Sequence, residues 1–147
     1  MLLRRVRDSA GPRSHKIFAH FSLTPARQDV LSQIPSELID ININAMPRTK
    51  VWEEMVRYKF VLSPYGNGLD CHRHWEALCL GCVPIMQPIG SNEMFKDLPA
   101  LIVDQWSNLT PELLDSFKPE AINLDKLLLN YWVTQFAPPP KDLTQIA

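Results

Sequence analysis

Residues 58–87 read YKFVLSPYGNGLDCHRHWEALCLGCVPIMQ, and this stretch decides the fold. The apolar run at 60–62 predicts a buried strand, and the proline and glycines that follow it force a turn. Asp70 is a favourable N-cap for the helix that the spacing of the next apolar residues predicts, and Gly81 is suited to end that helix. A second apolar run then begins at Val83. The stretch is therefore a strand–loop–helix–strand crossover, which requires a parallel sheet.

Strands and helices alternate along the rest of the chain. Apolar runs predict further strands, and capping residues followed by proline mark two helix starts. Short joints between alternating elements predict an α/β fold, a doubly wound parallel sheet of about four or five strands. The further predicted strands lie at 16–22, 38–43 and 101–103, and the predicted helices follow Thr24, span 48–58, follow Thr110 and span 124–136.

The composition is that of one globular domain. The chain has 147 residues, of which 46% are hydrophobic and 21% charged, and a chain of this length buries about two-thirds of its unfolded surface. The formal net charge of −1 argues against nucleic acid as a partner, because binding to nucleic acid needs a basic field. No run of the sequence approaches the roughly 20 apolar residues of a membrane segment.

The chain divides into three segments by composition. Residues 1–15 are basic and poor in apolar residues, which predicts a flexible, solvated terminus. Residues 16–137 hold all the predicted strands and helices. The tail at 138–147 opens with three prolines, which end regular structure.

Two cationic side chains, His72 and Arg73, fall in the first turn of the central helix. The helix dipole disfavours cations there by roughly 0.3–1 kcal/mol each, whereas a bound anion reverses the sign. The loop before this helix follows the carboxyl end of a strand, where open α/β sheets bind ligands and backbone N–H groups favour phosphate. Arg27 repeats the arrangement in the helix after Thr24. These residues predict a phosphate site, and Glu76, one turn beyond Arg73, is placed to bind ribose hydroxyls.

Ion pairing between these side chains explains the positions of the charges equally well. Side chains three or four apart on a helix are neighbours, so opposite charges at that spacing form solvated pairs. A glycine loop alone is a weak signal, and both interpretations stay open on the spacing. The alternative pairs are Arg73 or His74 with Asp70 or Glu76, and Arg27 with Asp29 or Asp40.

The run SPYGNGLDCHRHWEALCLGCVPI, residues 63–85, resembles the sugar-nucleotide-binding segment of exostosin-like glycosyltransferases. That family has a Pro-x-Gly-x-Gly loop, a helix reading Asp-x-x-Arg-x-Trp-Glu-Ala-Leu, and then Gly-x-x-Pro. The resemblance extends more weakly over residues 16–136. The matching positions are Pro64, Gly66, Gly68, Asp70, Arg73, Trp75, Glu76, Ala77, Leu78, Gly81 and Pro84.

The resemblance implies a fold, an activity and a site. The implied fold is the Rossmann-like, C-terminal lobe of a GT-B enzyme, which binds a nucleotide-diphosphate sugar for inverting sugar transfer. The sugar nucleotide is the donor substrate, and neither a separate cofactor nor a metal ion is implied. The implied donor-binding residues are Arg27, Gly66, Asn67, Gly68, His72, Arg73 and Glu76.

The same resemblance implies parts that this sequence does not supply. In the GT-B pattern an N-terminal lobe brings the acceptor and usually the general base, and we expect such a lobe as a missing partner. No catalytic residue can be named from the sequence. A longer enzyme of this kind would act in the lumen of the Golgi or endoplasmic reticulum.

Two other functions compete with the enzyme. One is a catalytically inactive or truncated lobe that holds a nucleotide, or a protein partner, without turnover. The other is an unrelated nucleotide-binding α/β domain.

The three cysteines predict no disulfide framework, because their number is odd and all lie within one crossover unit. Cys79 and Cys82 are interpreted as small core residues. Cys71 stands beside His72 at a helix start, which favours a lowered thiol pKa. The sequence indicates no residue that would orient Cys71 as a nucleophile.

Overall fold

The computed structural model describes residues 2–90, 92–119 and 123–136, and its centre is a five-stranded sheet in the order β2-β1-β3-β4-β5. Every neighbouring pair of strands is parallel. The predicted α/β class with a doubly wound parallel sheet is therefore confirmed. The strands are β1 Ser14–Ala19, β2 Ile39–Ile41, β3 Tyr58–Leu62, β4 Val83–Met86 and β5 Leu101–Ile102.

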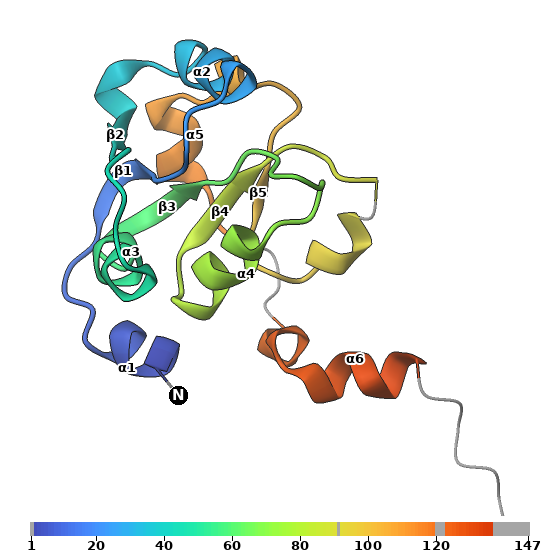
Figure 1. Cartoon of the computed structure of the whole chain (residues 1–147). Helices are drawn as coiled ribbons and strands as arrows, with labels where there is room; N and C mark the ends of the chain where they lie inside the picture. Colours follow the sequence, from blue (N-terminus) through green and yellow to red (C-terminus); the bar gives the residue numbers. More distant parts are fainter. Residues whose placement is uncertain (1, 91, 120–122, 137–147) are drawn as a thin grey trace, which may run out of the picture.

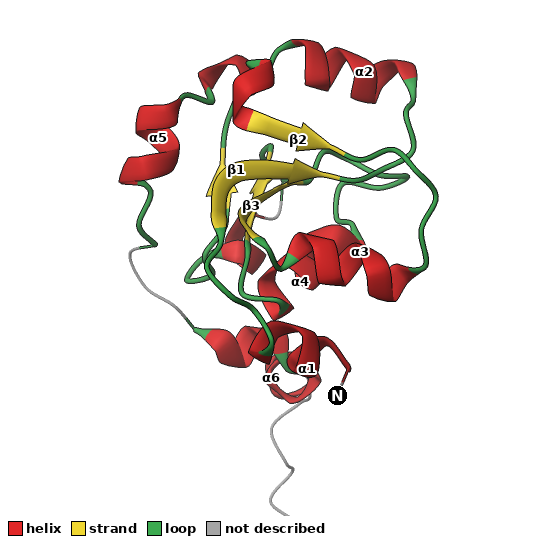
Figure 2. Ribbon diagram, turned by 90° about the vertical axis from the view of Figure 1, so that its left-hand side faces the viewer, coloured by secondary structure: helices red, strands yellow, loops and turns green. Residues whose placement is uncertain are grey.

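Helices cover both faces of the sheet (Figures 1 and 2). One hydrophobic cluster joins one sheet face to α2 and α5, and a second joins the opposite face to α1, α3 and α4. The last helix, α6, follows a 3₁₀ turn at Leu124–Leu127. The helices are α1 Leu2–Asp8, α2 Pro25–Ser32, α3 Arg48–Met55, α4 His72–Cys79, α5 Pro111–Ser116 and α6 Leu129–Phe136.

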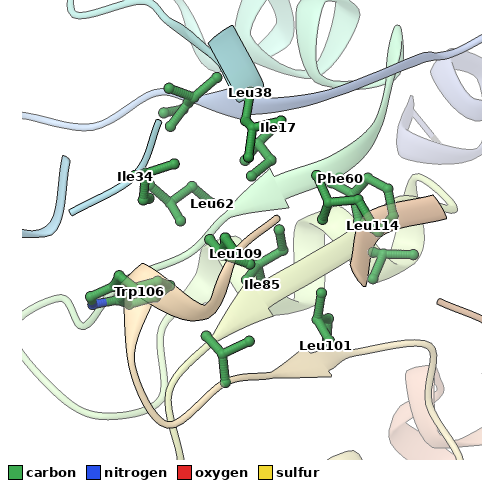
Figure 3. Close-up of a cluster of buried hydrophobic side chains, with 14 of the residues drawn as sticks. Ile17, Ile34, Leu38, Phe60, Leu62, Ile85, Leu101, Trp106, Leu109 and Leu114 are labelled. Atoms are coloured by element: carbon green, nitrogen blue, oxygen red, sulfur yellow. The ribbon is translucent and has the colours of Figure 1, made fainter. Parts of the chain in front are cut away.

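Alternation along the central strands creates the two layers of core. In β3, Phe60 and Leu62 face α2 and α5, whereas Val61 between them faces α3 and α4. Successive side chains of a strand point to opposite faces, so a strand covered on both faces is apolar throughout. Figure 3 shows the first layer, where Phe60 lies near Leu114 of α5 and Ile17 of β1 contributes from the neighbouring strand.

The strand order reverses between β1 and β3. The chain leaves β1 through α2 to β2 on one side, and returns through α3 to β3 on the other side of β1. The connections after β1 and β3 therefore diverge to opposite sides, which leaves a crevice outside the carboxyl ends of these two strands. Such a reversal is the usual ligand position in an open α/β sheet.

The N-cap of the central helix lies one residue later in the chain than predicted. Cys71 is the N-cap of α4, with extended backbone (φ −132°, ψ 150°). The His74 ring accepts the N–H of Cys71 at 3.3 Å, which satisfies a donor at the helix start. The carboxylate of Asp70, predicted as the cap, accepts the indole N–H of Trp75 at 3.0 Å. Gly81 ends the helix region with φ +72°, as predicted.

The predicted helix over 124–136 is interrupted. Leu128 has extended backbone (φ −103°, ψ 136°) and separates the 3₁₀ turn from α6. Lys126 is buried, and its ammonium group donates to the carbonyls of Glu93 and Lys96 in a neighbouring segment. The indole of Trp132 donates to the Lys126 carbonyl at 2.8 Å. These contacts stabilise the turn, because a continuous helix would move Lys126 away from the carbonyls to which it donates. The proline-rich tail at 138–147 lies outside the described residues.

The basic N-terminus is folded, whereas we expected a solvated segment. Residues 2–8 form α1, and Val6 is buried in the second core cluster. Arg13 donates from Nη1 to the carbonyl of Gly81 at 2.9 Å and from Nη2 to that of Leu80 at 2.7 Å. The last carbonyls of a helix lack partners within the helix and carry partial negative charge. The arginine therefore caps the C-terminus of α4, which the local sequence does not reveal. In the described part of the chain, no helix has the length and apolarity to cross a membrane.

We expect Arg13→Ala to lower the free energy of unfolding by about 1–3 kcal/mol, because charged hydrogen bonds to helix carbonyls are lost. Chemical denaturation measures the change. The matched control is Arg5→Ala, which removes an exposed arginine from α1. Equal stability of both variants would show that the Arg13 contacts do not stabilise the fold.

Candidate functional site

A cavity of about 350 Å³ lies in the crevice where the strand order reverses. The loop after β1 and the starts of α2, α3 and α4 enclose it. Its volume is within the range of about 300–1,000 Å³ that is typical of ligand pockets. We call it the arginine cavity, and its titratable lining residues are His20, Arg27, Arg48, His72, Arg73 and Glu76.

Arg27 and Arg73 meet at the ring of Phe21. Their guanidinium carbons lie 5.4 Å and 5.2 Å from its centroid. Phe21 itself is 6% exposed, so the ring is a fixed part of the core. The negative face of an aromatic ring attracts a cation within about 6 Å. Phe21 thus helps to hold two like charges close to each other.

Arg73 is buried, with 8% of its surface exposed. Its Nη1 donates to the Pro64 carbonyl at 3.3 Å and lies 3.9 Å from the sulfur of Cys71. Burial lowers the pKa of Arg73, and the charges of Arg27 and Arg48 add to that lowering, opposed by Cys71 and Glu76. Arginine nevertheless stays charged in proteins. The cavity therefore holds a buried cation whose own surroundings disfavour its charge.

The ion pairs that the sequence left open do not form at the two central arginines. Within the described residues, neither Arg27 nor Arg73 lies within ion-pairing distance of a carboxylate. Arg27 donates instead to the carbonyls of Ser22, at 2.9 Å, and Tyr65. Ion pairing in a solvated setting is therefore the wrong interpretation for both arginines.

Arg48 lies opposite Arg73, at the start of α3. Its guanidinium pairs with Glu76 at 3.3 Å and contacts Nε2 of His72 at 2.9 Å. Burial lowers the pKa of His72; Arg48, Arg73 and His74 lower it further, while Glu76 raises it. A neutral His72 accepts the Arg48 hydrogen bond at Nε2. Among the described residues that line the cavity, Glu76 is the one carboxylate, and it is thus already shared with one of the three arginines.

His20 lies at the end of β1 with one ring nitrogen engaged. Its Nδ1 is 2.8 Å from the carbonyl of Asn42, and a carbonyl requires a donor there. In the neutral ring the proton is therefore on Nδ1, and Nε2 carries the lone pair. Because His20 lines the arginine cavity, this nitrogen can accept a proton from a group bound nearby.

The glycine loop lies beside the cavity. Gly66 uses its N–H in a bond to the Gly68 carbonyl at 3.1 Å, and neither glycine has the left-handed backbone seen at Gly81. A Cβ atom on Gly66 would lie 3.5 Å from Cβ of Cys71 and 3.9 Å from Arg27. The loop therefore packs against the arginine side chains and is not part of the cavity lining, and Asn67 is exposed.

The structure brings together four of the predicted site residues: Arg27, His72, Arg73 and Glu76. The sequence reasoning missed Arg48 altogether. Arg48 repeats the pattern of the other two arginines, because it stands in the first turn of a helix that follows a strand. That repetition was the signal that would have found it.

A second cavity of about 290 Å³ adjoins the first, and Arg27 lines both. We call it the glutamine cavity, because three carboxamide side chains reach it. They come from α2 and from the segments that follow β4 and β5, so this cavity also lies at the carboxyl edge of the sheet. Its lining includes Gln33, Tyr65, Gln87, Gln105 and Trp106.

The sequence matches no protein-family model and no curated protein. The site is therefore interpreted from its own chemistry.

We expect Arg73→Met to change the free energy of unfolding by less than about 1 kcal/mol, because it replaces a buried, uncompensated charge with an apolar chain of similar volume. The control is Leu78→Ala, which empties a buried position of the same helix and should cost about 2–5 kcal/mol. Denaturant titration compares the two variants. A loss for Arg73→Met as large as that for Leu78→Ala would make Arg73 a structural residue.

Proposed function

We propose that this chain is the donor-nucleotide lobe of a glycosyltransferase, and that it binds the diphosphate of a nucleotide sugar in the arginine cavity. The observation that carries the proposal is the burial of Arg73 without a carboxylate partner among the described residues, beside Arg27 and Arg48. A buried charge without compensation is unfavourable. A diphosphate supplies the missing negative charge, and its oxygens match the planar fork of a guanidinium.

Different parts of the nucleotide sugar occupy the two cavities. Arg27 lines both, which favours the diphosphate at their junction with Arg73. Glu76 lines the arginine cavity, pairs there with Arg48, and offers its carboxylate oxygens to ribose hydroxyls, as the resemblance to exostosin-like enzymes implies. The glutamine cavity then receives the sugar, since carboxamides both donate to and accept from hydroxyl groups.

The same arrangement supports a chemical role. Negative charge builds on the diphosphate as its bond to the sugar breaks, and arginines aimed at that charge stabilise the transition state. His72 adds a further positive charge once a bound anion favours its protonation. His20, with Nε2 free, is the candidate base for an acceptor hydroxyl in the same cavity.

The first test is the contribution of the phosphates to binding. We expect calorimetry to show that uridine diphosphate binds more tightly than uridine, with a difference that shrinks as salt is added. Arg27→Met and Arg73→Met should each weaken diphosphate binding by about 10- to 100-fold, the value of a charged hydrogen bond. Arg57→Met is the matched control, because Arg57 is exposed and paired with Glu54. Equal affinity for uridine and its diphosphate would contradict the proposal.

The second test separates an enzyme from a binding module. With nucleotide-diphosphate sugars as the only substrates, we expect slow release of nucleoside diphosphate as water attacks the donor. Arg73→Met should slow this release by about 10²-fold, because it removes a group that stabilises the leaving diphosphate. Chromatographic analysis of the nucleoside diphosphate released at saturating donor measures the rate. Tight binding with no release would favour the inactive module.

A further inference from the structure

Cys71 lies in a cluster of polar side chains next to Arg73, which lines the arginine cavity. Its sulfur is 3.6 Å from the hydroxyl of Ser63 and 3.9 Å from Nη1 of Arg73. The residue is partly exposed, and it is the N-cap of α4, an eight-residue helix. A helix N-terminus, a guanidinium and a hydroxyl all favour a thiolate over a thiol.

His74 completes the cluster, and its hydrogen bonding and charge lower the pKa of Cys71. The ring is fully buried, and Nε2 donates to the Ser63 carbonyl at 3.1 Å. This bond fixes the ring so that Nδ1 faces the N-terminal end of α4. There Nδ1 accepts the Cys71 N–H at 3.3 Å when the ring is neutral, and lies 3.4 Å from a carboxylate oxygen of Asp70. Once protonated, the ring donates to Asp70 instead, so the carboxylate stabilises the imidazolium.

The three cysteines of the chain differ in their tendency to ionise. Burial raises the pKa of Cys71, but hydrogen bonding to His74 and its charge, with Ser63 and Arg73, lower it to about 7 overall. Burial raises the pKa of Cys79, and it raises that of Cys82 to about 11. Arg27 is a further charged group in this region, because a Cβ atom on Gly66 would lie 3.5 Å from Cβ of Cys71 and 3.9 Å from Nη2 of Arg27.

An independent observation points to an anion site near this sulfur. Arg73 has five N–H donors, and only Nη1 bonds to protein atoms in the described part of the chain. The side chain is buried yet lines the arginine cavity, so its remaining donors are available to a ligand bound there. A reagent with carboxylates that binds Arg73 is therefore held close to the sulfur of Cys71.

We propose that Cys71 is an activated thiol that exchanges with anionic low-molecular-weight disulfides, and that the mixed disulfide closes the arginine cavity. The Cys71 thiolate attacks one sulfur of the reagent, the reagent's S–S bond breaks, and its other half leaves as a thiolate that takes a proton from water. The carboxylates of the attached half then occupy the free donors of Arg73. The activation of the Cys71 thiol depends only on the side chains around it, whereas the closure of the arginine cavity rests on the proposed function.

The activation is tested by labelling the full chain with iodoacetamide from pH 5.5 to 9 and mapping each cysteine by mass spectrometry. We expect labelling of Cys71 to be half-maximal near pH 7. Cys79 and Cys82 are internal controls, and at pH 7 Cys71 should react at least about fivefold faster than Cys79. That figure combines a larger thiolate fraction with the lower nucleophilicity of a more acidic thiol.

Two variants show whether the cluster causes the activation. His74→Gln removes the imidazole and Ser63→Ala removes the hydroxyl, and each should move the half-maximal pH of Cys71 upward. Ser63→Ala is the milder change, which keeps the test valid if His74→Gln does not fold. A Cys71 profile that coincides with that of Cys79, or that neither variant moves, would overturn the activation.

The closure is tested with glutathione disulfide as the reagent. The modified chain should bind uridine diphosphate at least about tenfold more weakly, and reduction with dithiothreitol should restore binding; a Cys71→Ser chain treated in the same way should be unaffected. Equal binding before and after modification would overturn the closure. If the untreated chain binds no diphosphate, the proposed function and the closure both fail, while the labelling profile still decides the activation.

Discussion

The pairing of β1 with β3 is the constraint on which the rest of the structure depends. Ile17 aligns with Phe60 and Phe18 with Val61, although the two strands are separated in the chain by α2, β2 and α3. This register places Ile17 and Phe60 in one core layer and Phe18 and Val61 in the other. A slip by one residue would exchange the two layers. Because the strand order reverses at the same pair, the register also sets which loop residues face each other across the crevice.

The site is built from charges that the fold cannot satisfy by itself. Three arginines enter the arginine cavity from the first turns of three helices, and the one carboxylate there pairs with Arg48. A protein selected for stability alone would place acidic residues at those helix starts. Phe21 and backbone carbonyls reduce the repulsion but do not neutralise it. Local instability of this kind is a common property of binding sites, since it is relieved by the ligand.

The central helix serves the core, the cavity and the thiol cluster with different faces. Ala77 and Leu78 pack into two core clusters, Arg73 and Glu76 face the arginine cavity, and His74 turns back to Ser63 and Cys71. His72 and Arg73 lie four and three residues before Glu76, so these three side chains share the cavity face, whereas His74, Ala77 and Leu78 point elsewhere. The close spacing couples the groups electrostatically: Arg73 and His74 both lower the pKa of the Cys71 thiol. A change at one face is therefore felt at the others.

Local patterns were enough to predict all five strands, the helices α2 to α5 and the parallel α/β class. Apolar runs, proline-marked helix starts and the glycine at 81 report local backbone preferences, and these depend on neighbouring residues only. Arg27 and Arg73 were also visible, because a cation in a first helical turn is a local anomaly. The tertiary structure decided three further things: Arg73 is buried with no carboxylate partner among the described residues, Arg48 pairs with Glu76, and His74 and Ser63 surround Cys71. It also decided that Arg13 caps α4 and that Leu128 interrupts the last helix. Each of these depends on burial or on a partner far away in the chain, and such distances are set by packing, which no local pattern records.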